Sequence, residues 1–185
     1  MRKLKLQVQI TINGFIAGPN GEMDMFTWNW GEDIKNYVQA LTDDVDTIVL
    51  GRKLAEGFIP YWQDVAQNDE NPEQSSGKLF TDLPKIVFSK TIENSPWNNT
   101  TVSANLINDI QSLKSQNGKD IIAYGGANFV SNLIQENLID ELHLFINPTA
   151  LDAGLPIFLN KTNFQLKHSL AFECGIVVLC YEIKS

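Results

Sequence analysis

Three short segments of this sequence combine residues suited to holding phosphate groups. Gly125-Gly126 follows an apolar run and precedes a helical pattern, Gly51-Arg52-Lys53 has a similar position, and Ser89-Lys90 ends another apolar run. Glycines at such a turn expose backbone N–H groups at the positive end of a helix dipole and let an anion approach closely. Arginine can bind phosphate oxygens through two parallel hydrogen bonds. These segments therefore predict a site for a phosphorylated ligand.

Each segment also has a simpler interpretation. A glycine pair between a strand and a helix can serve the turn alone, and by itself it is a weak motif. Arg52 can equally pair with a surface carboxylate. Three such strand ends in one chain, however, favour a dinucleotide. We expect the glycine pair to hold its pyrophosphate. Arg52, Ser89 and Lys90 are then expected to hold another phosphate, such as the 2′-phosphate that distinguishes NADPH from NADH.

The chain alternates between strand-like and helix-like segments. Residues 4–12 alternate apolar and polar side chains, which predicts a strand with one apolar face. Residues 59–77 are polar and irregular, and we expect a long surface loop there, with room for one helical turn before Leu79. Together with the other elements, this order predicts an α/β fold in one domain, 1–185, with a mostly parallel sheet and an antiparallel C-terminal part. The further strands are expected at 46–51, 84–88, 100–103, 121–124, 138–146, 164–172 and 175–183, and the helices at 31–41, 53–58, 106–113 and 129–138.

Composition excludes several classes of protein. The chain has 43% hydrophobic and 19% charged residues, as in an ordinary globular protein, and its net charge of −8 argues against a general binder of nucleic acid or anionic membranes. No apolar run is long enough to span a membrane, and the N-terminus lacks a secretion signal, so we expect a cytoplasmic protein. Cys174 and Cys180 would lie about 20 Å apart in one strand, too far for a disulfide. With no Cys/His cluster, no metal site is predicted.

The residues after the first strand are candidates for contact with a second ligand. Asn13-Gly14 ends that strand, and a loop with further glycines follows its carboxyl end, where ligands of open α/β sheets bind. The loop can equally be a plain connection. Beyond it, Phe26, Trp28 and Trp30 stand near two methionines and several carboxylates. These side chains can wall a flat ring, or they can belong to the core or to a subunit interface.

The ordered set of these motifs resembles the dihydrofolate-reductase-like superfamily. It is most similar to the bacterial branch related to the reductase domain of the bifunctional riboflavin-biosynthesis deaminase-reductase. The likeness extends over nearly the whole chain, and the set is specific although each motif alone is not. The segments that carry it are Asn13-Gly14-Phe15-Ile16-Ala17, Leu50-Gly51-Arg52-Lys53, Val87-Phe88-Ser89-Lys90, Tyr124-Gly125-Gly126, Leu138-Ile139-Asp140-Glu141-Leu142 and Pro148.

The resemblance implies a three-layer α/β/α fold with a mixed central sheet of about eight strands, NADPH across the strand ends, a substrate pocket beside the nicotinamide, and a homodimer. If the chain is such a reductase, we expect the substrate to stack near Ala17, Phe26 and Trp28, and Asn13 can orient it. The residues implied to line the cofactor are Ala17, Gly51, Arg52, Lys53, Ser89, Lys90, Gly125, Gly126, Ala127 and Asn128.

This sequence departs from the superfamily pattern at several positions expected to contact substrate or phosphate. The branch usually has Ser-x-Asp-Gly where this chain has Thr11-Ile12-Asn13-Gly14, and an asparagine cannot exchange a proton as a carboxyl does. Leu54 stands where a threonine usually contacts phosphate. The acid that binds pterin falls near Glu32-Asp33, with Asp24 as the alternative, so Asp24 and Asp33 are the candidate proton donors. Burial among aromatic rings would raise the pKa of such a donor. Either acid can instead be a charge or a cap at a helix N-terminus, and this interpretation is favoured for Asp33.

The function predicted from these features is that of an NADPH-dependent reductase that acts on a pteridine-like or aminopyrimidine-like substrate. A non-catalytic nucleotide-binding or regulatory dimer on the same fold is the alternative, because no fixed acid is evident. A third possibility is that only the fold is shared and that the site binds a different anion.

Overall fold

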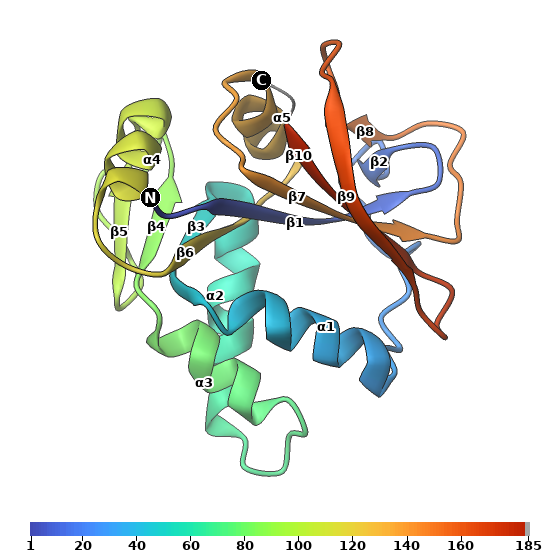
Figure 1. The fold of residues 1–185 in the computed structure, drawn as a ribbon. Coiled ribbons are helices and arrows are strands. Elements are labelled where there is room, and N and C mark those ends of the chain that lie inside the picture. The colour runs from blue at the N-terminus through green and yellow to red at the C-terminus, as the bar shows by residue number, and fades with distance from the viewer. Residues whose placement is uncertain (184–185) are drawn as a thin grey trace.

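The computed structural model describes residues 1–183 and contains one mixed sheet of eight strands in the order β5-β4-β3-β6-β1-β7-β10-β9. The strands from β5 to β7 run parallel, and β10 is antiparallel to both of its neighbours (Figure 1). This agrees with the expected parallel sheet and antiparallel C-terminal part. The strands are β1 (Leu4–Thr11), β3 (Val45–Gly51), β4 (Lys85–Phe88), β5 (Thr100–Ser103), β6 (Asp120–Tyr124), β7 (Glu141–Asn147), β9 (Phe164–Ala171) and β10 (Val177–Ile183).

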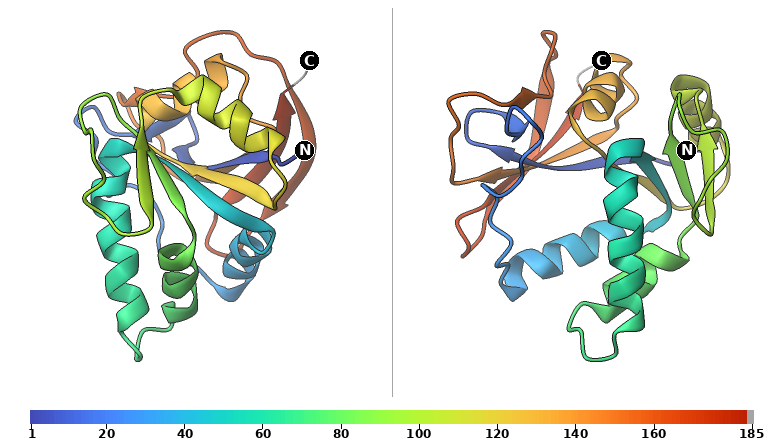
Figure 2. Two further views of the ribbon diagram at one scale, coloured as in Figure 1. Left: turned by 90° about the vertical axis from the view of Figure 1, so that its left-hand side faces the viewer. Right: turned by 180° about the vertical axis from the view of Figure 1, so that it is seen from behind.

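Helices cover both faces of this sheet and make three layers (Figure 2). The helices α1 (Glu32–Thr42), α2 (Arg52–Gln67) and α3 (Gln74–Asp82) lie on one face, and α4 (Leu106–Ser115) and α5 (Ala127–Gln135) lie on the other. Parallel strands need such crossover helices, and burial on both faces explains the continuous apolar runs of β3 and β6. The predicted three-layer α/β/α fold is confirmed.

The alternation of β1 divides its side chains between these two layers. Leu4, Leu6 and Val8 are buried in a cluster with residues of α4 and α5. The side chains of Gln7 and Gln9 therefore point to the opposite face, toward the layer of α1, α2 and α3. A central strand thus carries two amides on a face that a helical layer covers.

The expectation of a surface loop over residues 59–77 is wrong. The helix α2 continues to Gln67 and α3 is a nine-residue helix. Phe58 and Trp62, one helical turn apart on α2, pack against Phe80 of α3 with ring centroids 5.6 and 4.7 Å apart. A Cβ atom on Gly77 would lie 2.6 Å from the backbone nitrogen of Ala66, so glycine permits the close approach of the two helices. Tertiary contacts here outweigh a polar local sequence.

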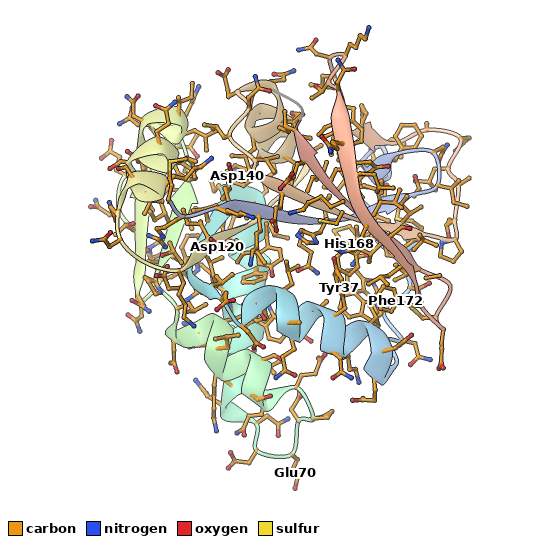
Figure 3. All side chains as sticks on the ribbon, in the orientation of Figure 1. Tyr37, Glu70, Asp120, Asp140, His168 and Phe172 are labelled. Atoms are coloured by element: carbon orange, nitrogen blue, oxygen red, sulfur yellow. The ribbon has the colours of Figure 1, made fainter. Side chains whose placement is uncertain are left out.

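The ring of Tyr37 fixes α1 against the C-terminal strands (Figure 3). Its centroid lies 5.6 Å from that of Phe172 and 5.9 Å from that of Phe145. Its hydroxyl lies 2.7 Å from Nδ1 of His143. These contacts hold one side of α1 over β7, and a further contact of Tyr37 with His168 reaches β9. Residues on the other side of α1 line a cavity together with residues of α2.

The structure adds a second small sheet and shifts the start of one predicted strand. A second, two-stranded sheet pairs β2 (Phe15–Ala17) with β8 (Leu155–Pro156), and β7 begins at Glu141 rather than at residue 138. Cys174 and Cys180 are free thiols, as expected. Among residues 1–183, no helix has both the length and the apolar character needed to span a bilayer.

Candidate functional site

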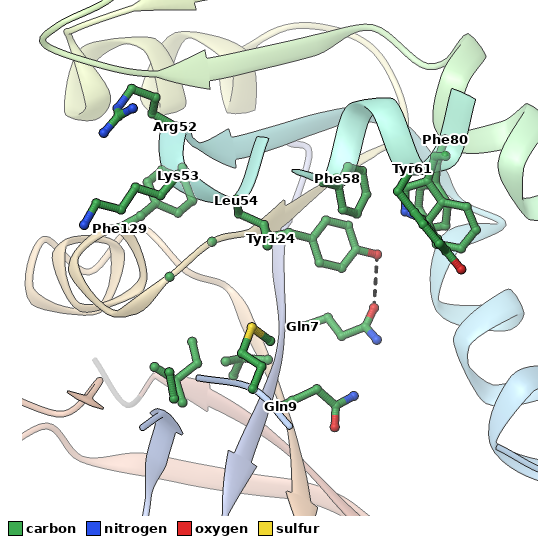
Figure 4. A pocket seen from close by; sticks show the side chains of 18 of the residues that line it. Gln7, Gln9, Arg52, Lys53, Leu54, Phe58, Tyr61, Phe80, Tyr124 and Phe129 are labelled. Carbon is green, nitrogen blue, oxygen red and sulfur yellow. Dashed lines mark hydrogen bonds between the residues drawn. The ribbon is translucent and has the colours of Figure 1, made fainter. Parts of the chain in front are cut away.

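A cavity of about 1440 Å³ opens at the carboxyl ends of β3, β4 and β6 and extends along the sheet toward α1 (Figure 4). Ligands of open α/β sheets bind at this edge. The structure brings together every residue that we expected to line the cofactor. In the cavity wall are Ala17, Gly51, Arg52, Lys53, Ser89, Lys90, Gly125, Gly126, Ala127 and Asn128.

Two helices begin at this edge, and neither has a side-chain cap. The N-cap of α2 is Gly51, and the N-cap of α5 is Gly126. Neither first turn contains an acidic residue, and α2 instead begins with Arg52 and Lys53. Cations are unfavourable at the positive end of a helix dipole, where negative charge is normally stabilising. The local electrostatics therefore favour an anion beside these N-termini.

The glycines at the two junctions have different physical roles. A Cβ atom on Gly125 would lie 2.2 Å from Cδ1 of Phe129, and one on Gly51 would lie 2.8 Å from its Cβ. Both positions need glycine because Phe129 of α5 packs directly against them. A Cβ atom on Gly126 would meet no other atom within 4 Å, and this residue has an ordinary φ of −80°. The absent side chain of Gly126 leaves the approach to α5 open.

Arg52 and Ser89 already have partners within the chain. An Nη1–H of Arg52 donates to Glu56 one helical turn away, as in the simpler interpretation. The Oγ of Ser89 accepts the N–H groups of Thr91 and Ile92 at 3.1 and 3.0 Å. Ser89 therefore shapes the turn after β4, while Lys90 beside it is exposed.

Away from the end that is suited to binding phosphate, the cavity is lined by amides and aromatic rings. Gln7 and Gln9 of β1 form part of its wall, and the hydroxyl of Tyr124 donates to Oε1 of Gln7 at 3.0 Å. Burial raises the pKa of Tyr124, so its hydroxyl remains a protonated donor. Four rings of α2 and α3 complete this part: Phe58, Tyr61, Trp62 and Phe80. Sequence reasoning missed these residues, although two glutamines on the polar face of a predicted strand were a visible signal.

The comparisons with known proteins decide the family. The family model of the RibD C-terminal domain matches residues 2–178. YyaP of Bacillus subtilis (strain 168), described as an uncharacterized protein, is 32% identical over 97% of this chain and 94% of its own length. This chain belongs to the RibD C-terminal domain family.

Two solved structures show that the fold is shared. A Shewanella sp. PV-4 protein, described as a candidate riboflavin biosynthesis protein, matches over 100% of both chains with a TM-score of 0.72 and 20% identity. A Thermotoga maritima deaminase/5-amino-6-(5-phosphoribosylamino)uracil reductase matches with a TM-score of 0.68 and 16% identity. The match covers 99% of this chain but 57% of the Thermotoga chain.

In this RibD-type domain, only one of the three residues expected to contact substrate lines the cavity. Trp28 is in the wall and is 57% exposed. Phe26 is buried, with its ring edge toward Trp28 at a centroid distance of 6.2 Å. The Nδ2 of Asn13 donates to the carbonyl of Leu151 at 2.6 Å, and its Oδ1 accepts the N–H of the same residue at 3.2 Å. Asn13 thus connects two loops of this RibD-type domain.

The two candidate proton donors do not line the cavity either. Asp24 is exposed. Asp33 accepts the N–H of Ile34 at 2.8 Å and that of Glu173 at 2.9 Å, so it stabilises the start of α1. Asp33 lies in the first turn of α1, which agrees with its interpretation as a charge at a helix N-terminus, while the N-cap is Gly31 and has no side-chain cap. The carboxyl groups that do line the cavity belong to Glu32, Asp43 and Glu73. Within residues 1–183, no group of three potential metal ligands is present.

Asn147 holds the loop before α1 against the sheet. It is fully buried at the end of β7, and its Oδ1 accepts the N–H of Thr27 at 2.9 Å. Its Nδ2 donates to Oε1 of Gln9 at 2.7 Å. One side chain thereby fixes both the Thr27 loop and an amide in the cavity wall.

Proposed function

We propose that this chain is an NADPH-dependent reductase that transfers hydride to a C=N or C=O bond of a pteridine-like or aminopyrimidine-like substrate. The observation that carries the proposal is a single cavity that joins two uncapped helix N-termini to a chamber lined with amides and aromatic rings. A dinucleotide and a small planar ring together need such a combination. The reductase activity in the name of the Thermotoga relative supports the same class of reaction.

The residues at the sheet edge fit the phosphates of NADPH. The open position at Gly126 lets a pyrophosphate approach the N-terminus of α5. Arg52 and Lys53 can bind the 2′-phosphate, since guanidinium and ammonium groups both bind phosphate oxygens strongly. When bound, NADPH supplies the hydride, and the chain supplies binding and orientation.

The substrate ring would be oriented in the part of the cavity that lies away from Arg52 and Lys53. Ala17 and Trp28 line it from the loop side, and Gln9 lines it from β1. These groups can bind a planar ring and limit the water around it. Neither Asp24 nor Asp33 lines the cavity, so in our proposal the proton that completes the reduction comes from a water molecule. No side chain of the chain is assigned as the acid.

A titration of the purified protein with NADPH tests this function. Nicotinamide fluorescence should change on binding, and absorbance at the reduced nicotinamide band should fall when a substrate from a panel of pteridines, aminopyrimidines and quinones is added. Absence of binding at millimolar NADPH would refute the proposal. The same titration with NADH measures how strongly the 2′-phosphate contributes.

A second candidate is a non-catalytic nucleotide-binding or regulatory protein. It is favoured by the position of Asp33 at the start of α1 and by the exposure of Asp24, because neither carboxyl reaches the cavity wall. This candidate predicts NADPH binding without oxidation across the whole panel. Turnover of any member would rule it out.

We also propose that the chain forms a homodimer through its C-terminal strands. The sheet ends at β9, and Leu166, Leu170 and Val177 on β9 and β10 are 51%, 45% and 36% exposed. An exposed edge strand with apolar side chains is suited to association. Sedimentation equilibrium should give twice the chain mass of 20.8 kDa, and Leu166→Lys with Leu170→Lys should give the monomer. A monomeric wild-type protein would contradict the proposal.

A further inference from the structure

The cavity has two ends of different chemical character. We call the end lined by Gln7, Gln9, Tyr124 and the rings of α2 and α3 the inner chamber. Figure 4 shows the side chains of Arg52 and Lys53 at the opposite end from Gln9 and Tyr61. The two ends can therefore select different parts of their ligands.

The orientation of the Gln9 amide follows from a backbone group. The N–H of Thr27 can only donate, so the Asn147 atom that it contacts at 2.9 Å must be Oδ1. The Nδ2 of Asn147 then faces Gln9 and needs an acceptor, which is Oε1 of Gln9 at 2.7 Å. The remaining Nε2 of Gln9 is consequently the atom available to a ligand.

Gln7 is oriented in the same way by Tyr124. Within the part of the chain that the structure describes, Gln7 is the hydrogen-bond partner of the Tyr124 hydroxyl. In the structure this hydroxyl donates to Oε1 of Gln7 at 3.0 Å, so Nε2 of Gln7 is turned away from Tyr124. Gln7 and Gln9 are two positions apart on β1 and share a face of the strand. Two N–H donor groups are therefore preset beside each other.

The charges around the inner chamber disfavour an anion. On the α1 and α3 side, the charged residues in the cavity wall are Glu32, Lys35, Asp43 and Glu73. Lys35 is the single cation among them in the described chain, and its Nζ lies 3.4 Å from Glu32. The carboxylates thus exceed the cations here, whereas Arg52 and Lys53 provide the positive charge at the other end. Among the described residues, a phosphate placed in the inner chamber would therefore meet more carboxylates than cations.

From these relationships we infer that the inner chamber selects an uncharged, unphosphorylated planar heterocycle that accepts hydrogen bonds from Nε2 of Gln7 and Nε2 of Gln9. The inference rests on the proposed function, since it names the substrate of the same cavity. It also separates this chain from the Thermotoga relative, whose name specifies a phosphoribosyl substrate. Gln7 and Gln9 are then specificity-determining residues, while Tyr124 and Asn147 position them.

The first test uses the unaltered protein and compares uridine with uridine 5′-monophosphate by calorimetry, with and without saturating NADP. With NADP bound, uridine should bind at least tenfold more tightly than the monophosphate. Equal or tighter binding of the monophosphate would overturn the inference, and so would failure of uridine to bind. The result does not depend on turnover or on whether any variant folds.

The second test measures binding of pteridine-2,4-dione to Gln7→Glu and Gln9→Glu. Each change keeps the shape and the accepting oxygen but replaces the donor group, so affinity should fall about tenfold or more, as expected when a buried hydrogen bond is lost. Gln39→Glu is the matched control, because it adds the same charge at an exposed position in the wall of the same cavity. Equal losses in all three variants would overturn the inference.

These outcomes are separable from those of the proposed function. NADPH titration of the same proteins reports the phosphate end of the cavity, and the ring probes report the inner chamber. If the wild-type protein does not bind NADPH but prefers uridine to its monophosphate as expected, the proposed reductase function is refuted. If it binds NADPH but lacks this preference, only the inference about the inner chamber is refuted.

Discussion

Gly125 lies directly against Phe129, since a Cβ atom on Gly125 would stand 2.2 Å from Cδ1 of that ring. The next residue, Gly126, has open space in the direction of its missing side chain. The glycine pair therefore combines a residue required for packing with one that leaves a surface uncovered. This difference allows the structural and the ligand-binding interpretations of the pair to be tested separately.

The variants Gly125→Ala and Gly126→Ala should behave differently. Gly125→Ala forces Phe129 to move and should lower the free energy of unfolding by about 1–3 kcal/mol, as overpacking does. Gly126→Ala meets no atom and should change stability by less than about 0.5 kcal/mol. It should nevertheless weaken NADPH about tenfold or more, because the methyl group covers the approach to α5. Denaturant unfolding and NADPH titration check both, and unchanged NADPH affinity in Gly126→Ala would remove the pyrophosphate assignment.

Arg52→Ala should reduce affinity for NADPH far more than for NADH. Loss of a charge-assisted contact to the 2′-phosphate is expected to cost about tenfold or more for NADPH. Glu56→Gln is the control, since it removes the partner of Arg52 and keeps the guanidinium. It should leave NADPH binding the same or tighter. Equal losses of NADPH and NADH in Arg52→Ala would show that Arg52 does not recognise the 2′-phosphate.

Asn147→Asp should destabilise the fold strongly. The change places a carboxylate oxygen where Nδ2 now donates to Oε1 of Gln9 and to the carbonyl of Phe145, at 2.7 and 3.2 Å. A buried charge that faces acceptors should cost about 3 kcal/mol or more in the free energy of unfolding. Asn36→Asp, at an exposed position of α1, should cost less than about 0.5 kcal/mol. Similar values for both in urea unfolding would contradict the role of Asn147.

Acid should reduce the stability of the wild-type protein more than that of Glu141→Gln. The His143 imidazole, whose Nε2 lies 3.6 Å from a carboxylate oxygen of Glu141, lowers the pKa of this carboxyl most, and hydrogen bonds from Lys3 and Lys167 lower it further. Together they hold the pKa of Glu141 well below its ordinary value of 4.5. The unfolded chain then binds more protons than the folded one below about pH 4.5, so this stabilisation is present above that pH and is lost as the pH falls further. Urea unfolding between pH 7 and pH 3 measures the slope. Glu136→Gln, at an exposed position, is the control and should keep the wild-type dependence of the free energy of unfolding on pH. If Glu141→Gln also keeps that dependence, Glu141 is not the carboxyl responsible.

Local sequence patterns were sufficient to predict the strands and turns at the sheet edge that lines the cavity. Glycine at a strand-to-helix junction and the alternation of β1 are properties of neighbouring residues, and the order of the motifs placed them in one family. Residues 59–77 could not be read in this way, because α2 and α3 are stabilised by contacts between Phe58, Trp62 and Phe80 across a turn. Such contacts between two helices cannot be predicted from the pattern of neighbouring residues.

Contacts between residues far apart in the sequence also decide the roles of the residues that were predicted to bind substrate or donate a proton. Besides partners close in the sequence, Asn13 and Asp33 each bond a distant backbone group, of Leu151 and Glu173, which are 138 and 140 positions away. These distant contacts cannot be predicted from the residues near Asn13 or Asp33 in the sequence. The orientation of the Gln9 amide likewise depends on Asn147, which is 138 residues distant.

A crystal structure of the complex with NADP would show where the phosphates bind. We expect the pyrophosphate oxygens to lie within hydrogen-bond distance of the backbone N–H groups in the first turn of α5, beside Gly126, and the 2′-phosphate to contact Arg52 or Lys53. An empty cavity at millimolar NADP, or a dinucleotide whose pyrophosphate lies away from Gly126, would contradict this expectation.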